Sequence, residues 1–380
     1  MSHCMVKRHI SRENKIFTGR ITLILLFCTL QIRAQAQDSV STPRWMDSLF
    51  FNFFISSGYS YNPNDPDSGK NNFQVFDINN NTFTIDIMEL AIRKDADAAG
   101  STGFRMDLTA GSSVPKVTKS AGLTIGDLDF HQMYFSYVVP AGNGLKLDLG
   151  KFITAMGSEV IEGFDGYNSN YTHSFLFGYA IPFTHTGIRG MYRFNSQVSA
   201  LFMLVNGWDD AIDNNMSKSI CEQMSLSPAA GMNISVTHMI GPEKNENDTD
   251  YRNSFDVVGS DSVCSKLSIG VNGDFSTEMH SGAGNGTGEW WGIAGYLKYC
   301  FSREFGIAIR CERFADVDGL RTGVRQNLRE CTLTPELRLT PNVILRSDIR
   351  IDGSDQQVFQ KGNSWTDTQA TLSANAIYTF

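Results

Sequence analysis

The residues best suited to act on a charged solute are three acids in one long polar stretch, Thr154 to Thr184. Glu159, Glu162 and Asp165 recur at every third position there. Carboxylates at this spacing supply no covalent chemistry, but on a loop folded into a water-filled channel they would create a field that selects ions. We therefore predict a constriction loop with Glu159, Glu162 and Asp165 as its charged residues. The alternative is that the stretch lies over a channel mouth and that its acids are simply solvated.

Five arginines could supply the opposite charge. They occupy the polar positions of segments that alternate between polar and apolar residues: Arg105, Arg189, Arg310, Arg346 and Arg350. Placed opposite the acidic stretch, they would form a basic pore wall and complete a transverse field. Each arginine could instead be one half of a structural ion pair between neighbouring strands.

The residues typical of metal binding and catalysis lack the necessary spacing. His173 and His185 flank the acidic stretch without an H-x-x-x-H pattern or a companion cysteine. Residues 209–215 are rich in oxygen ligands, which leaves weak surface calcium binding open, but the EF-hand spacing and its closing glutamate are absent. Ser174 adjoins His173 in the chain, and adjacency alone does not make a nucleophile and base pair. We predict no metal, no cofactor and no enzymatic activity.

The elements that would position these residues are β-strands, because apolar and polar residues alternate along the chain. In 343–352, for example, Val343, Leu345, Ile349 and Ile351 alternate with charged residues. Candidate strands begin near sixteen positions: Leu49, Thr82, Thr102, Leu128, Leu145, His185, Val198, Lys218, Gly231, Tyr251, Lys266, Glu289, Phe305, Leu328, Val343 and Asp367.

Short and long connectors alternate between these strands. Short ones such as Pro140 to Gly144 follow long polar ones such as Ser112 to Gly126. This alternation is typical of an outer-membrane barrel, with short periplasmic turns and long external loops. The sequence thus predicts an all-β transmembrane antiparallel barrel of about sixteen strands, with both termini on the periplasmic side.

The polar phase of the strands carries paired charges, which suits a water-filled interior wider than side chains can fill. Aromatic residues gather at strand ends, where amphipathic rings favour the membrane interface. The chain also ends on an alternating segment with Tyr378 and Phe380, which matches the terminal signature for outer-membrane assembly. A secreted soluble β-protein, with its apolar phase inward, remains the alternative.

The N-terminus has the pattern of a secretory signal peptide over residues 1–36. A basic segment precedes the apolar run Ile21 to Leu30, and Ala34-Gln-Ala36 fits a cleavage site before Gln37. Residues 37–48 would then be a short periplasmic segment and 49–380 the barrel. Residues 37–380 carry 26 basic and 39 acidic side chains, so a nucleic-acid partner is not expected.

Five cysteines follow the predicted signal peptide: Cys221, Cys264, Cys300, Cys311 and Cys331. Their odd number and lack of C-x-x-C spacing predict neither a disulfide framework nor a zinc site. Cys311 lies on the apolar phase of its strand, so we expect it to act as a small hydrophobic residue.

Several short sequence segments resemble those of the OmpL-like beta-barrel porin-2 family. They are GKFIT at 150–154, GSEVIE at 157–162, the stretch Gly163 to Arg189, VNGWD at 205–209, IGPE at 240–243 and the terminal IYTF. The similarity extends over about 48–380. It implies an outer-membrane porin and no defined catalytic or ligand residues.

The expected function is passive diffusion of ions and small hydrophilic solutes across the outer membrane of a diderm bacterium. The expected partners are outer-membrane lipid, the barrel-assembly machinery and the diffusing solutes. Whether the barrel is a monomer or a trimer, and which solute it carries, stay open. The alternatives are a non-conducting structural or adhesive barrel and, third, an outer-membrane barrel enzyme.

Overall fold

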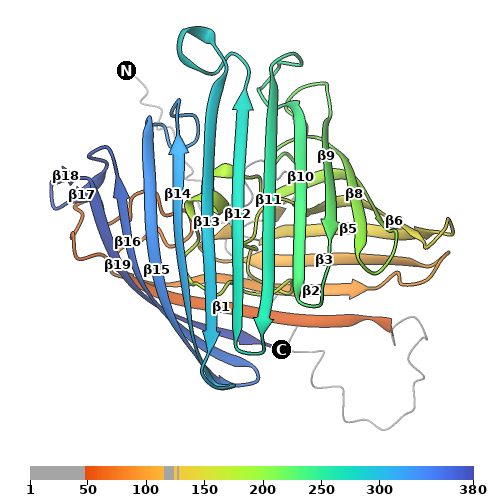
Figure 1. The fold of residues 1–380 in the computed structure, drawn as a ribbon, viewed down its shortest axis with the longest axis horizontal. Coiled ribbons are helices and arrows are strands. Elements are labelled where there is room, and N and C mark those ends of the chain that lie inside the picture. Colours follow the sequence, from red (N-terminus) through yellow and green to blue (C-terminus); the bar gives the residue numbers. More distant parts are fainter. Residues whose placement is uncertain (1–47, 115–123, 126–127) are drawn as a thin grey trace, which may run out of the picture. The chain divides into compact units, whose positions relative to one another are not determined.

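The computed structural model describes residues 48–114, 124–125 and 128–380, which form an antiparallel β-barrel (Figure 1). The predicted signal peptide and residues 37–47 lie outside the described residues. The wall has sixteen long strands: β1 (Phe50–Tyr61), β2 (Thr82–Lys94), β3 (Thr102–Ala110), β5 (Leu128–Val139), β6 (Leu145–Ile153), β7 (Thr184–Arg193), β8 (Val198–Val205), β9 (Ser219–Leu226), β10 (Met232–Pro242), β11 (Tyr251–Cys264), β12 (Leu267–Glu278), β13 (Gly288–Cys300), β14 (Phe305–Asp316), β15 (Gln326–Thr340), β16 (Val343–Ser354) and β19 (Thr368–Thr379).

Three short strands and two short helices complete the described elements. β4 (Thr124–Ile125) pairs with β5, and β17 (Phe359–Lys361) pairs with β18 (Ser364–Thr366) in the connector before β19. The helices are the π-helix η2 (Leu176–Ala180) and the 3₁₀ helix η3 (Ala283–Asn285). No helix in the described part of the chain is long and apolar enough to cross a membrane.

The barrel closes because β1 pairs with β2 on one side and with β19 on the other. Phe53 and the terminal Phe380 complete this seam by exchanging two backbone hydrogen bonds of 2.9 and 2.8 Å. The sixteen predicted strands are confirmed, and each begins within two residues of its predicted start. This includes β9, whose sequence alternates only weakly.

The apolar phase of the strands faces outward and the polar phase faces the interior. In β16, the polar residues Arg350 and Asp352 are fully buried. The apolar residues that alternate with them, Ile349 and Ile351, are 47% and 59% exposed. The same pattern runs around the wall, from Phe83 and Ile85 of β2 to Leu372 of β19. An apolar outer surface of this kind is what lipid covers, and a soluble barrel would show the reverse.

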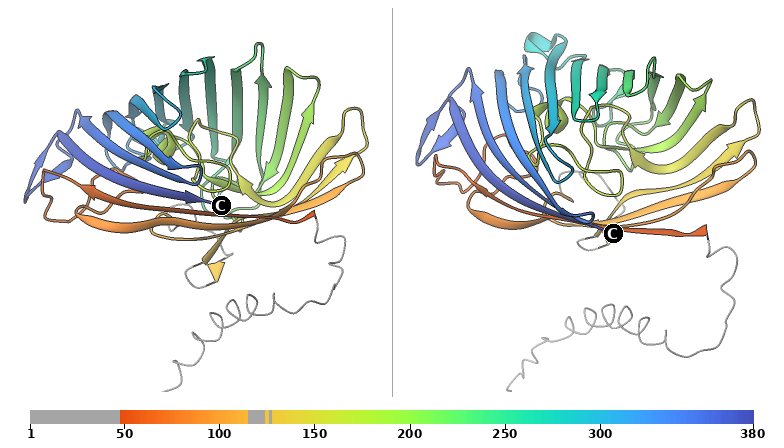
Figure 2. Two further views of the ribbon diagram at one scale, coloured as in Figure 1. Left: turned by 90° about the horizontal axis from the view of Figure 1, so that it is seen from below. Right: turned by 60° about the horizontal axis from the view of Figure 1, so that its bottom comes forward.

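Long and short connectors alternate as predicted, so that long loops gather at one end of the barrel and tight turns at the other (Figure 1). The β15–β16 turn has two residues between Thr340 and Val343, whereas the β6–β7 connector spans 154–183. We call residues 154–183 the inward loop, because this segment lies inside the ring of strands (Figure 2).

The cysteine prediction is wrong at one pair. Cys311 of β14 and Cys331 of β15 form a disulfide. They are directly opposed in the strand register, and both face outward. Cys311 is therefore a cross-strand link and not a free hydrophobic residue. Cys221, Cys264 and Cys300 are free thiols.

Candidate functional site

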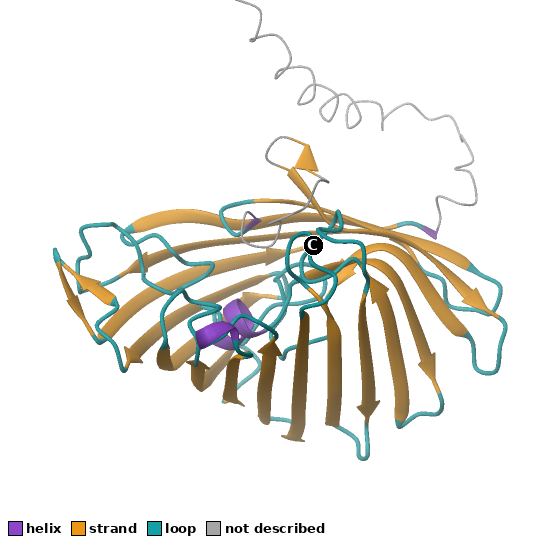
Figure 3. Ribbon diagram, turned by 90° about the horizontal axis from the view of Figure 1, so that it is seen from above, coloured by secondary structure: helices purple, strands orange, loops and turns teal. Residues whose placement is uncertain are grey.

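The inward loop is anchored to strands on several sides of the barrel. Its π-helix η2 lies inside the ring of strands (Figure 3). The backbone carbonyl of Ala180, at the end of η2, accepts a hydrogen bond of 3.2 Å from the indole of Trp290 in β13. Elsewhere, Ala155 accepts from Gln223 of β9 at 2.7 Å, and Asn170 donates to Thr334 of β15 at 2.7 Å. These anchors come from widely separated strands, so the loop crosses the interior.

Each of the three predicted loop acids contacts one of the predicted wall arginines. Glu162 forms a bidentate ion pair with Arg346, with N–O distances of 2.7 and 2.9 Å. Glu159 lies 3.1 Å from Arg310. The third ion pair, between Asp165 and Arg105, is also bidentate.

The remaining two arginines do not meet a loop acid. The guanidinium of Arg350 donates to Asp352 at 2.7 Å and to the carbonyl of His173 in the inward loop at 2.6 Å. Arg189 pairs with Asp148 of β6 at 2.7 Å.

These pairs are in contact, with no open gap between acid and base. The side chains of Arg310 and Arg346 are fully buried, and those of Glu159 and Glu162 are 4% and 5% exposed. Opposite charges this close largely cancel at a distance, so they create little transverse field across open water. The arrangement is that of an anchor between the loop and the wall.

Wall carboxylates that the sequence analysis did not single out hold the loop backbone. Glu312 accepts hydrogen bonds from the N–H groups of Phe175 and Leu176, just where η2 begins. Asp348 accepts from the N–H and the hydroxyl of Thr172, both at 2.8 Å. Their alternation in the sequence places them inside, but nothing in the sequence shows that a distant loop supplies their donors.

A larger cavity lies on the long-loop side of the inward loop, with a volume of about 630 Å³. Its lining includes Asp209, Glu243, Arg252 and Arg321 from the connectors and the strand ends next to them. Both arginines lie over the rings of Trp208 and Trp290, at 4.7–5.5 Å. Burial raises the pKa of Glu243 to about 7 and that of Asp209 to about 6.

A smaller cavity of about 300 Å³ lies on the short-turn side. It is lined by Ser260 and Ser268 near the β11–β12 turn and by Glu159, Tyr167 and Lys298. The inward loop contributes to the lining of both cavities, through Tyr179 and Ile181 on one side and 158–160 and 165–170 on the other. The loop therefore lies between two chambers of the barrel interior.

The two histidines that flank the acids are engaged in the loop's own packing. The ring of His185 bonds to the Gly207 carbonyl at 2.9 Å and to the Thr154 hydroxyl at 3.1 Å. His173 stacks on Phe177 and contacts the side-chain amide of Asn168 at 3.2 Å. In the 209–215 stretch, Asp209 accepts two backbone N–H groups and Asp213 pairs with Lys218. These contacts are structural.

Tyr378 and Phe380 lie where the seam closes, at the end of β19. Both side chains face outward, 41% and 76% exposed. Tyr378 is opposite Ile55 of β1 and Val343 of β16.

A family model described as "Putative beta-barrel porin-2, OmpL-like" matches residues 48–380. No curated protein matches the chain. Among solved structures, the outer membrane channel DcaP of Acinetobacter baumannii has a TM-score of 0.61 at 10% identity, covering 87% of this chain and 97% of that one.

Two further structures have the same fold. The OprB structure of Pseudomonas putida has a TM-score of 0.59 at 11% identity, over 89% of this chain and 96% of that one. The anion-selective porin from Comamonas acidovorans has a TM-score of 0.58 at 10% identity, over 88% and 99%. At such identities the likeness establishes the architecture alone.

Proposed function

The chain belongs to the beta-barrel porin-2, OmpL-like, family and is an outer-membrane porin, and we propose that the inward loop is its constriction. Ions and small hydrophilic solutes would pass from the larger chamber, past the loop, to the smaller one. The observation that carries this proposal is that the loop lies inside a polar barrel and lines a cavity on each side. Selectivity then depends mainly on chamber residues such as Arg321, Asp209 and Glu243, because the charges of the loop acids are compensated by their arginines.

The test is single-channel conductance of the refolded chain 37–380 in a planar bilayer under a salt gradient. We expect discrete conductance steps and a measurable reversal potential. A barrel that inserts and is protease-resistant but gives no steps would contradict the porin proposal and favour the non-conducting structural or adhesive barrel. We also propose that the chain has no enzymatic activity.

Ion preference should depend on pH through the larger chamber. The raised pKa values of Asp209 and Glu243 mean that both carboxyls are mostly charged at pH 8 and mostly neutral at pH 5. Arg321 stays cationic over this range, because burial lowers its pKa only to about 10. Lowering the pH from 8 to 5 should therefore shift the reversal potential toward anions.

The matched control for the pH effect is the double variant Asp209→Asn, Glu243→Gln. It should show an anion-shifted reversal potential at pH 8 and a much flatter pH profile. If the variant retains the full pH dependence of the wild type, other groups control the preference.

We also propose how the chain is exported and assembled. Residues 1–36 would be removed as a signal peptide, which mass measurement of the N-terminus of the exported protein checks. Lipid would cover the apolar outer surface, and the assembly machinery would recognise the C-terminal strand.

Deleting Phe380 should strongly reduce the amount of folded barrel in the outer membrane. The deletion removes the last aromatic side chain and both backbone hydrogen bonds to Phe53 at the seam. The measurement is the heat-modifiable fraction in isolated outer membranes, with Phe301→Ala, an exposed aromatic in the β13–β14 turn, as the control. Normal assembly of the deletion variant would show that Phe380 is not a recognition element.

A further inference from the structure

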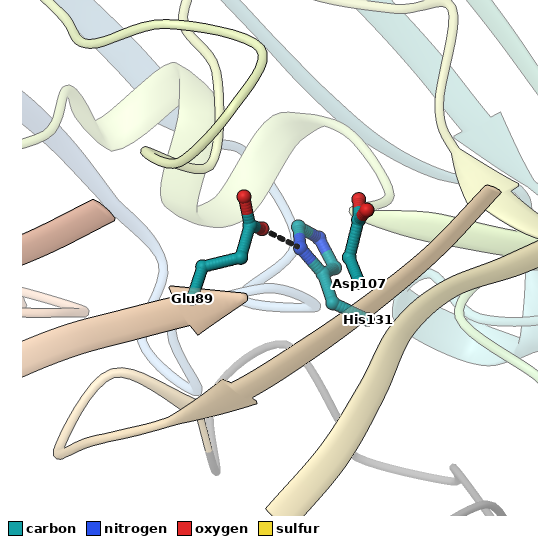
Figure 4. Close-up of side chains that lie close together, drawn as sticks. All are labelled: Glu89, Asp107 and His131. Atoms are coloured by element: carbon teal, nitrogen blue, oxygen red, sulfur yellow. Dashed lines mark ion pairs between the residues drawn. The ribbon is translucent and has the colours of Figure 1, made fainter. Parts of the chain in front are cut away.

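Three polar side chains gather inside the wall where β2, β3 and β5 lie side by side (Figure 4). Glu89 of β2, Asp107 of β3 and His131 of β5 are each at most 2% exposed. One potential ligand atom from each lies within 4.8 Å of the other two. Nδ1 of His131 is 3.6 Å from a carboxylate oxygen of Glu89.

A β-bulge directs His131 into this cluster. Asp107 is paired with Gln132, but Leu108 is paired with Phe130, so His131 is the extra residue of β5. As a result, His131 and Gln132 are both buried on the inner side, although neighbours on a strand normally face opposite ways. Bulges of this kind are common beside functional sites, where they redirect a side chain.

Neither ring nitrogen of His131 has a hydrogen-bond partner among the residues that the structure describes. Leaving buried polar atoms without partners is costly, and an unsatisfied group in a folded protein points to a ligand or an ion. The neutral imidazole is the side chain most often used as a metal ligand.

Both carboxylates are held in place by donors from outside the cluster. The N–H of Phe164 in the inward loop donates to Oε1 of Glu89 at 2.6 Å, while Oε2 of Glu89 faces His131. Arg105 and Gln132 donate to the carboxylate of Asp107 at 2.9–3.0 Å. Outer donors of this type orient the ligands of protein metal sites.

The loop approaches Glu89 closely because residue 163 is a glycine. A Cβ at Gly163 would lie 2.6 Å from the Glu89 carboxylate, so any other residue at this position would displace that carboxylate from the cluster. The loop backbone therefore packs directly on the cluster.

We propose that Glu89, Asp107 and His131 bind a divalent transition-metal ion of the Zn²⁺ type. Imidazole with two carboxylates suits such an ion, and the two negative charges balance its charge. With bonds of about 2.1 Å to Oε2 of Glu89 and Nδ1 of His131, their separation gives an angle of about 118° at the metal, near tetrahedral. A carboxylate oxygen of Asp107 lies within 4.8 Å of both atoms and would supply the third ligand, which leaves a fourth position for water.

Binding is tested by titrating Zn²⁺ alone into the detergent-refolded chain 37–380, after chelator treatment, by calorimetry. We expect one site per chain that weakens at least about tenfold in His131→Ala and in Glu89→Gln. The control is His238→Ala, because His238 lies on β10, stacked on Phe255 and bonded to Asn253, away from the cluster. Gel mobility before and after heating establishes that each variant is a folded barrel.

X-ray absorption of the zinc-loaded wild type is a second measurement that needs no variant. Nitrogen and oxygen ligands at about 2.0–2.1 Å with an imidazole signature would support the site. Sulfur at about 2.3 Å would instead indicate adventitious binding to the free thiols, and would overturn the proposal. So would the absence of binding, or equal affinity in His131→Ala and wild type. None of these readouts depends on conductance, so the metal site and the porin proposal fail separately.

Discussion

Neutralising the three acids of the inward loop together will shift the reversal potential strongly toward anions and raise single-channel conductance. The triple variant Glu159→Gln, Glu162→Gln, Asp165→Asn leaves Arg310, Arg346 and Arg105 without their loop partners. Arg346 loses its Glu162 partner, and removing one partner of a buried pair costs about 3–5 kcal/mol, whereas Arg310 keeps Glu330 and Arg105 keeps Asp107. Admitting water to Arg346 relieves that cost, so we expect the loop to move off the wall and the charge that faces the channel to become more positive by three.

The control for this variant carries the same change in net charge on exposed acids. Asp67→Asn, Asp97→Asn and Glu304→Gln alter residues that are exposed and lie outside the inward loop. Its conductance should match the wild type, and its reversal potential should move far less. Equal shifts in the two triple variants would mean that the loop acids affect permeation only through overall charge.

The fold was predictable from the sequence because it depends on local patterns. Alternation with period two identifies each strand, and the alternating connector lengths identify the two ends of the barrel. The paired charges at the polar positions indicated that the barrel interior, and not its outer surface, contacts water. Even β9 could be placed, since an even strand count requires a strand between β8 and β10.

The contacts of the site could be predicted only in part, since they join residues far apart in the chain. The acids and arginines were identified by type and phase, but Glu159 meets Arg310 across 151 positions and Glu162 meets Arg346 across 184. The periodicity of a strand does not predict which residues so far apart in the chain will meet. The sequence therefore could not distinguish a transverse field, a structural ion pair and a solvated loop. The structure supports structural pairing of these charges.

Two features were visible in the sequence, but our predictions did not include them. Cys311 and Cys331 are equally distant from residue 321, inside the β14–β15 connector, so an antiparallel hairpin brings them opposite each other. In β5, the polar residues His131 and Gln132 follow one another and interrupt the alternation, which is the mark of a bulge. Both features depend on the strand register, that is, on which residues of neighbouring strands lie opposite each other. The register can be inferred once the strands are assigned.

Replacing Arg310 with alanine will destabilise the barrel more than any exposed substitution. The guanidinium is fully buried and contacts Glu330, Glu159 and the carbonyl of Thr172. Without it, Glu159 and Glu330 lose their closest counter-charge and only Arg350, 4.0 Å from Glu330, remains nearby, so the free energy of unfolding should fall by about 3–5 kcal/mol. Urea unfolding in lipid vesicles, followed by tryptophan fluorescence, measures the change. Channel recordings should also become noisier, because the loop loses an anchor on β14.

Arg313→Ala is the matched control, because Arg313 lies on the same strand but faces outward, over Trp291 and bonded to Asn327. Its removal should cost about 1 kcal/mol or less. Combining Arg310→Met with Glu159→Gln and Glu330→Gln should recover part of the lost stability, since replacing a whole buried ionic set is far less costly than breaking it. If the combined variant is as unstable as Arg310→Ala, the loss comes from packing around the Arg310 side chain and not from the unpaired carboxylates.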